Sequence, residues 1–161
     1  HLIYVGPCHQ TGDTLIHVPS EGVVFTGDVI FHECTPMGWN GSYEKWMKNL
    51  DFIISLKPKV IVPGHGPVCG VEGVVQMKAY LEYVRGEAMR CFGLGMSALD
   101  ASKKIDFGPY AEWRAPARIF MNVERAYREF RNEAGDAPWD HAKTFDAIYH
   151  VAKARGLHLE F

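Results

Sequence analysis

The sequence predicts a mixed α/β fold, in which short strands occupy the first 70 residues and helices occupy the rest. Three runs of β-prone residues come first, at residues 2–5, 14–18 and 23–26, and turn residues separate them. An amphipathic helix follows, and after it comes a further apolar run at residues 60–62. Strand, helix and strand in this order favour an α/β layer arrangement. The length of 161 residues is that of a single domain.

The first helix is predicted to begin after Ser42, which is a good N-cap residue. Apolar side chains then recur at helical spacing until Lys57 and Pro58 end the pattern; they are Tyr43, Trp46, Met47, Leu50, Ile53 and Ile54. The next run, residues 60–62, is wholly apolar, as expected of a strand buried on both faces. It leads directly into a turn rich in glycine and proline at residues 63–67.

From residue 71 onward the periodicity of the apolar residues is helical, and the first stripe runs until Gly93. Ser97 begins a short helix, Pro116 lies in the first turn of another, and Pro138 precedes a third. We therefore expect residues 1–70 to form one unit and residues 71–161 to form a helical extension that is packed on it. The two parts are expected to share a core.

The composition excludes several classes of partner. There are 17 basic and 19 acidic residues with no basic cluster, which argues against nucleic acid as a partner. No apolar stretch approaches the roughly 20 residues that span a bilayer, so we expect no membrane partner. The four cysteines, Cys8, Cys34, Cys69 and Cys91, contain no C-x-x-C pair, and reduced thiols are the simplest interpretation. A cytoplasmic protein is therefore expected.

Three polar residues follow predicted strands. His9 comes after the first strand, Asp28 after the third and His65 after the fourth. Functional groups collect at such strand ends in α/β sheets, and imidazole and carboxylate groups are ligands that zinc accepts. A metal site is the resulting hypothesis. Taken singly, the two histidines are also compatible with turn residues, and Asp28 with a loop cap.

The sequence around these three residues resembles a known family. The segments P-C-H-Q-T-G-D at residues 7–13, F-T-G-D at residues 25–28 and V-P-G-H-G-P at residues 62–67 occur in the order found in the second half of the metallo-β-lactamase fold superfamily. The resemblance covers about residues 1–70 and is to the hydroxyacylglutathione hydrolase-like and lactonase-like metallo-hydrolases. It implies the second half of an αββα sandwich, followed here by the helical region.

The resemblance also implies a dinuclear site, usually of zinc and sometimes of iron or manganese. His9 would then belong to the first metal, Asp28 would bridge both metals as a catalytic group, and His65 would belong to the second. In this family a metal-bound hydroxide attacks an ester, lactone, thioester or lactam type of small-molecule substrate. His32, four residues beyond Asp28, is a further catalytic candidate as a substrate contact or proton shuttle, and a surface histidine is the alternative.

One family motif is missing. The H-x-H-x-D-H motif, which supplies the other ligands of both metals in this family, occurs nowhere in the sequence. We therefore expect the chain to be an incomplete portion of the enzyme, inactive alone. It should bind either the missing N-terminal half or a second copy of itself, because half a sandwich leaves one sheet face uncovered.

Three functions remain open from the sequence. The first is a metal-dependent hydrolase of this superfamily. The second is a non-catalytic truncated homologue that acts as an oligomeric binding or structural module. The third is oxidoreductase chemistry at iron, which the metal identity would decide.

Overall fold

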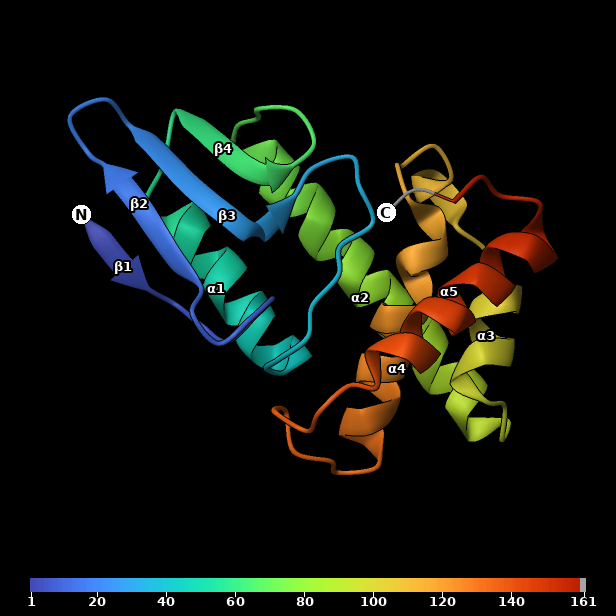
Figure 1. Ribbon diagram of the computed structural model, residues 1–161. Coiled ribbons are helices and arrows are strands. Elements are labelled where there is room, and N and C mark those ends of the chain that lie inside the picture. The colour runs from blue at the N-terminus through green and yellow to red at the C-terminus, as the bar shows by residue number, and fades with distance from the viewer. Residues whose placement is uncertain (160–161) are drawn as a thin grey trace.

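A computed structural model describes residues 1–159 (Figure 1). It is a mixed α/β structure, as the sequence predicts. The elements, in chain order, are β1 (Leu2–Tyr4), β2 (Thr14–Val18), β3 (Val23–Phe31), α1 (Tyr43–Ser55), β4 (Val60–His65), α2 (Val71–Gly93), α3 (Ala98–Lys104), α4 (Ile119–Phe130) and α5 (His141–Arg155). Two short 3-10 turns, Gly108–Tyr110 and Pro116–Arg118, lie before α4.

The strands form one sheet in the order β1-β2-β3-β4. Strand β2 is antiparallel to β1 and to β3, whereas β3 and β4 are parallel. Strands β1, β3 and β4 therefore run in the same direction, and their carboxyl ends lie at one edge of the sheet.

Two predicted strands end later than expected. Strand β3 continues to Phe31 rather than stopping at residue 26, and β4 continues to His65 rather than to residue 62. The pairing of β3 with β4 extends both strands, and it passes two irregularities between Phe25 and Phe31. Gly27 lies in the left-handed region at φ 50°, so the sequence Gly27-Asp28 resembles a turn although it is an irregular part of a strand.

Helix α1 packs on one face of the sheet (Figure 1). The Ser42 hydroxyl accepts a hydrogen bond from Lys45 N at 3.1 Å and caps the helix as expected. Trp46 and Leu50 are completely buried, and the Trp46 indole N–H donates to Val29 O at 2.9 Å. This bond joins the helix to the strand that carries Asp28.

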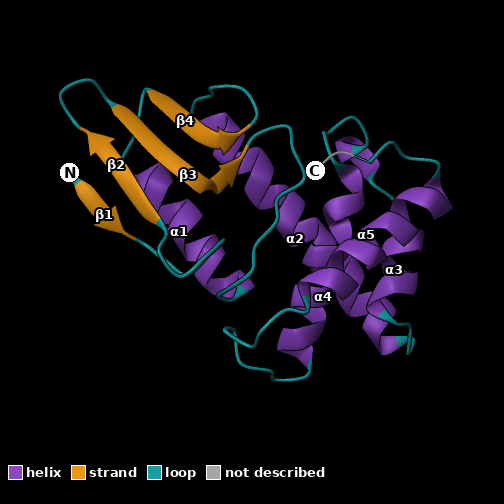
Figure 2. Ribbon diagram, viewed as in Figure 1, coloured by secondary structure: helices purple, strands orange, loops and turns teal. Residues whose placement is uncertain are grey.

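Helix α2 connects the sheet to the helical region, which lies at the other end of the molecule (Figure 2). Its residue Met77 contacts the backbone N of Phe31 in β3 through its sulfur at 3.3 Å. Farther along, α2 packs against α4. One cluster of buried side chains includes residues of the sheet, α1, α2 and the C-terminal helices. The core is therefore continuous across residue 70, and the division into two units at that point stays a prediction.

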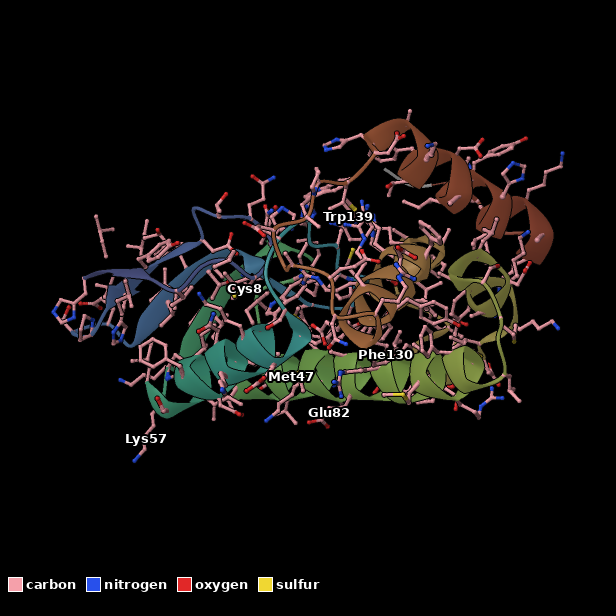
Figure 3. The ribbon with its side chains drawn as sticks, turned by 90° about the horizontal axis from the view of Figure 1, so that it is seen from below. Cys8, Met47, Lys57, Glu82, Phe130 and Trp139 are labelled. Atoms are coloured by element: carbon pink, nitrogen blue, oxygen red, sulfur yellow. The ribbon has the colours of Figure 1, made fainter. Side chains whose placement is uncertain are left out.

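The opposite face of the sheet carries no helix among the described residues. Both α1 and α2 lie on the same side of the strands (Figure 3). On the other side, Leu2 pairs with Ile16 and Ile16 with Phe25, so the three side chains form one row across the strands. They are 77%, 47% and 42% exposed. We call this row, together with the 65% exposed Tyr4, the open sheet face.

No helix among residues 1–159 combines the length and the apolar character that are needed to cross a bilayer.

The packing of α1 gives a test of the fold. Leu50→Ala should lower the free energy of unfolding by about 2–5 kcal/mol, because it leaves a cavity at a fully buried position. Urea unfolding measures the change. Lys48→Ala, at an exposed position on the same helix, should change the free energy by less than about 0.5 kcal/mol. Equal effects of the two substitutions would contradict the described packing.

Candidate metal centre

The structure brings His9, Asp28 and His65 together at the edge where β1, β3 and β4 end. Asp28 lies within β3, His65 is the last residue of β4, and His9 is in the loop after β1. His9 Nε2 is 3.2 Å from Asp28 Oδ2, and His65 Nε2 is 3.5 Å from Asp28 Oδ1. Each carboxylate oxygen therefore faces a different imidazole.

The protonation pattern of the His9 ring follows from its contacts. Its Nδ1 lies 2.7 Å from Met37 O, and a carbonyl oxygen only accepts hydrogen bonds, so Nδ1 carries a proton. In the neutral ring the lone pair of Nε2 then faces the Asp28 carboxylate, which is also an acceptor. Two acceptors at this distance repel unless a proton or a metal cation lies between them. A carbonyl on the far ring nitrogen is also the usual partner of a metal-ligating histidine.

The loop that carries His9 is held by Asp13. Its carboxylate accepts hydrogen bonds from the backbone N–H groups of Cys8, His9 and Gln10, at 2.8, 2.7 and 3.1 Å. Asp13 therefore acts on the backbone of the loop. The N–H of Trp39 donates to His9 O at 2.7 Å, which ties this loop to the segment after β3.

Glycine is required next to His65. A Cβ atom on Gly64 would overlap with Asp28 Oδ1 and would lie 2.6 Å from the carbonyl carbon of Gly27. Gly66, at φ 87°, would overlap with His32 O. The His65 ring stacks on Phe31, with 4.8 Å between the ring centroids. The sequence G-H-G thus allows the turn to approach β3 closely and places the imidazole beside the carboxylate.

His32 lies in the turn directly after β3 and contacts the turn after β4. Its Nδ1 is 3.0 Å from Pro67 O, and its backbone N–H donates to His65 O at 3.0 Å. These contacts hold the turn after β4, and the edge of the His32 ring faces Gly73 of α2. A catalytic role for His32 stays a prediction.

The neighbouring cysteines are protonated near neutral pH. Burial raises the pKa of the Cys8 thiol to about 11, and burial also raises the pKa of Cys69 to about 11. The Asn49 side-chain N–H donates to the Cys8 sulfur at 2.7 Å, so this sulfur is held toward α1. The donors available at the edge are the imidazoles and the carboxylate.

These donors fit a divalent cation in kind but not in number. A cavity of about 420 Å³ lies beside His9 and Asp28 and gives access to the edge. Within residues 1–159, however, no group of three or more His, Cys, Asp or Glu side chains converges on one cation position. A stable zinc site has four ligands, or three and a water molecule. Each position beside Asp28 therefore needs donors in addition to those described.

Sequence patterns do not reveal the Met37 carbonyl that fixes the His9 ring. It is a backbone group, 28 residues away in the chain, and nothing in the sequence marks it. The role of Asp13 is detectable in part, because Asp in a turn commonly hydrogen-bonds to backbone groups close to it in the chain.

Comparisons with known proteins agree with the sequence motifs. The model of the metallo-beta-lactamase superfamily matches residues 1–65. A curated relative, the beta-lactamase-like protein 2 homolog of Drosophila melanogaster, is 41% identical over 63 residues, which is 37% of this chain and 21% of that protein.

Solved structures extend the likeness of the fold beyond residue 65. A metallo-beta-lactamase family protein of Thermus thermophilus has a TM-score of 0.59 at 16% identity over 81% of this chain and 43% of that chain. The stereoselective inverting sec-alkylsulfatase Pisa1 of Pseudomonas sp. has a TM-score of 0.61 at 14% identity over 80% of this chain and 23% of that chain.

The chain thus spans about a fifth of the curated relative and less than half of either structural neighbour. The three motifs, the family model and the fold of the structural neighbours agree. Over residues 1–65 the chain is therefore similar to the metallo-beta-lactamase superfamily.

Proposed function

We propose that the chain supplies one side of the metal centre of a metal-dependent hydrolase. His9 would bind one metal ion, Asp28 would bridge two, and His65 would bind the other. The observation that carries the proposal is the Asp28 carboxylate, which presents one oxygen to each of two imidazoles at 3.2 and 3.5 Å. Zinc suits these donors, and iron or manganese are the alternatives.

Other residues of this chain orient the two histidines of the proposed metal centre. The Met37 carbonyl directs the unprotonated nitrogen of His9 toward Asp28. The Phe31 ring fixes the plane of His65, and the glycines beside it leave room for the carboxylate. When bound, the metal would polarise a substrate oxygen and lower the pKa of a water molecule to about 7.

The substrate class is proposed from the cavity and the family. The cavity beside His9 and Asp28 is lined by small polar side chains such as Gln10, Thr14 and Thr26, and its volume is about 420 Å³. A small molecule with an ester, lactone, thioester or lactam bond suits this size. The test is hydrolysis of one substrate of each of these four bond types by the purified protein. The activity should be lost when a chelator is added and restored by zinc. Hydrolysis that persists with the chelator would contradict it.

We further propose that the open sheet face binds a second copy of this chain when the chain is made alone. The row Leu2, Ile16 and Phe25 is apolar, uncharged and exposed, and pairing of two copies about a twofold axis would cover it. A partner would also bring further donors near the edge. An N-terminal half of the same family is the alternative occupant of this face.

A non-catalytic oligomeric module is the second candidate. Two observations favour it: the incomplete set of metal donors among the described residues, and the open sheet face, which can bind a partner without any catalysis. Chelator-sensitive hydrolysis distinguishes the hydrolase from this module.

The compartment we propose is the cytoplasm, because residues 1–159 contain no disulfide and all four cysteines are buried.

Loss of the bridging carboxylate tests the centre. Asp28→Asn keeps the shape of the side chain and removes its charge, so zinc affinity should fall at least about tenfold. Isothermal titration with zinc measures the affinity. Asp51→Asn, an exposed position on α1, is the control and should leave zinc binding unchanged. Unaltered affinity in Asp28→Asn would sink the assignment.

The close approach of the β4 turn gives a second test. Gly64→Ala would push a methyl group against the Asp28 carboxylate and Gly27, so zinc affinity should fall about tenfold or more while the helical circular dichroism is retained. Gly86→Ala is the matched control, because a Cβ there meets nothing within 4 Å. It should stabilise α2 by up to about 1 kcal/mol and leave zinc affinity intact.

The oligomeric state tests the open sheet face. Light scattering should give a mass of at least twice 18.1 kDa for the chain alone, and Phe25→Lys should shift it to the monomer. Met89→Lys changes a residue that is 49% exposed on α2 and should leave the mass unchanged. A stable wild-type monomer at micromolar concentration would contradict pairing with a second copy and leave the N-terminal half as the occupant.

A further inference from the structure

Helix α4 inserts a buried arginine into the loop that carries His9. Arg125 is 4% exposed, and its Nη2 donates to Cys8 O at 2.9 Å across a separation of 117 residues in the sequence. The same nitrogen donates to Asn40 O. The guanidinium lies over the Trp46 ring, 5.1 Å from its centroid. One side chain of the helical region therefore joins two loops of the sheet region.

The peptide group between Cys8 and His9 is held on both sides. Arg125 binds its carbonyl, and Asp13 Oδ2 accepts its N–H, which belongs to His9, at 2.7 Å. This peptide directly precedes the Cα atom of His9. Its orientation sets the direction in which the imidazole leaves the backbone.

The segment of residues 37–40 holds the carbonyl group and the ring of His9. The N–H groups of Trp39 and Asn40 donate to His9 O at 2.7 and 3.3 Å, and Met37 O accepts from the ring. Because Arg125 also binds Asn40 O, it holds the segment that supplies these contacts against the His9 loop. Removing the guanidinium would leave the two loops joined only by the contacts that His9 itself makes, so the position of His9 would depend on those contacts alone.

Burying Arg125 at this position is unfavourable for the free energy of folding. Burial lowers the pKa of its guanidinium from the ordinary value, and Nη1 is buried without a hydrogen-bond partner among residues 1–159. A buried ionic group is frequently replaced by an apolar one without loss of stability, and an unsatisfied buried donor is unfavourable. Packing alone would be served by an apolar side chain. The hydrogen bonds of Nη2 to the two carbonyls are what an apolar side chain does not provide.

We propose that Arg125 is a positioning residue for His9: through the carbonyls of Cys8 and Asn40 it holds the imidazole in the orientation that presents Nε2 to Asp28. This inference rests on the proposed function for the ligand role of His9, although the positioning itself is measurable without metal. It makes the helical region part of the site.

The test is nuclear magnetic resonance of the ring nitrogens in chain labelled with ¹⁵N-histidine, at fixed pH and without metal. In the wild type, the His9 signals should report one tautomer with the proton on Nδ1. In Arg125→Met, this tautomer should lose its dominance and the His9 signals should shift. The signals of His65, which is held by β4 and Phe31, should stay in place.

Two further variants complete the design. Arg131→Met, at the C-terminal end of the same helix, removes side-chain hydrogen bonds to Glu124 and Glu133 and should alter neither histidine. Arg125→Lys keeps a cation that can reach one carbonyl and should restore part of the His9 signal pattern. If Arg125→Met fails to fold, Arg125→Lys is compared with the wild type instead, and a shift confined to His9 is again the expected result.

Zinc affinity is measured on the same variants. A fall of about tenfold in Arg125→Met, with His9 shifted and His65 unshifted, supports the proposal. Unchanged His9 signals in a folded Arg125 variant, or equal shifts of His9 and His65, overturn it. If the wild type binds no zinc, the ligand role of His9 fails, and the ring signals still decide whether Arg125 positions the imidazole.

Discussion

The shared direction of β1, β3 and β4 is the constraint on which the site depends. Because these strands end at the same edge of the sheet, residues far apart in the chain meet there, and Asp28 comes to lie between His9 and His65. Within residues 1–159, α1 and α2 support the sheet from the same side. Trp46 of α1 binds the strand that carries Asp28, and Arg125 of α4 binds the loop that carries His9.

Much of this could be predicted from the sequence. The periodicity of the apolar residues identified the helices, with Ser42 as the cap of α1, since helix signals are local. Three short motifs indicated the resemblance to the superfamily and identified the three candidate site residues. The ends of the strands were predicted less accurately. Asp28 was expected after β3 but lies inside it, because pairing with the distant strand β4 extends β3 through Gly27. In the sequence, Gly27 resembles a turn residue.

The support of the site could not be predicted in the same way. The Met37 carbonyl is a backbone group, and Arg125 lies 117 residues from the residue it binds, so neither has a local pattern. The alternation of side chains along the strands does explain why the open sheet face is apolar, since Leu2, Ile16 and Phe25 fall on one side of the pleat.

The proposed metal centre places the Asp28 carboxylate between two metal positions, one on each histidine. Anomalous X-ray scattering at the zinc edge, from crystals of the chain grown with zinc, tests it most directly. Anomalous peaks are expected beside Nε2 of His9 and beside Nε2 of His65, with Asp28 between them. Zinc bound only elsewhere, or zinc absent from this edge at saturating concentration, would contradict the proposed metal centre.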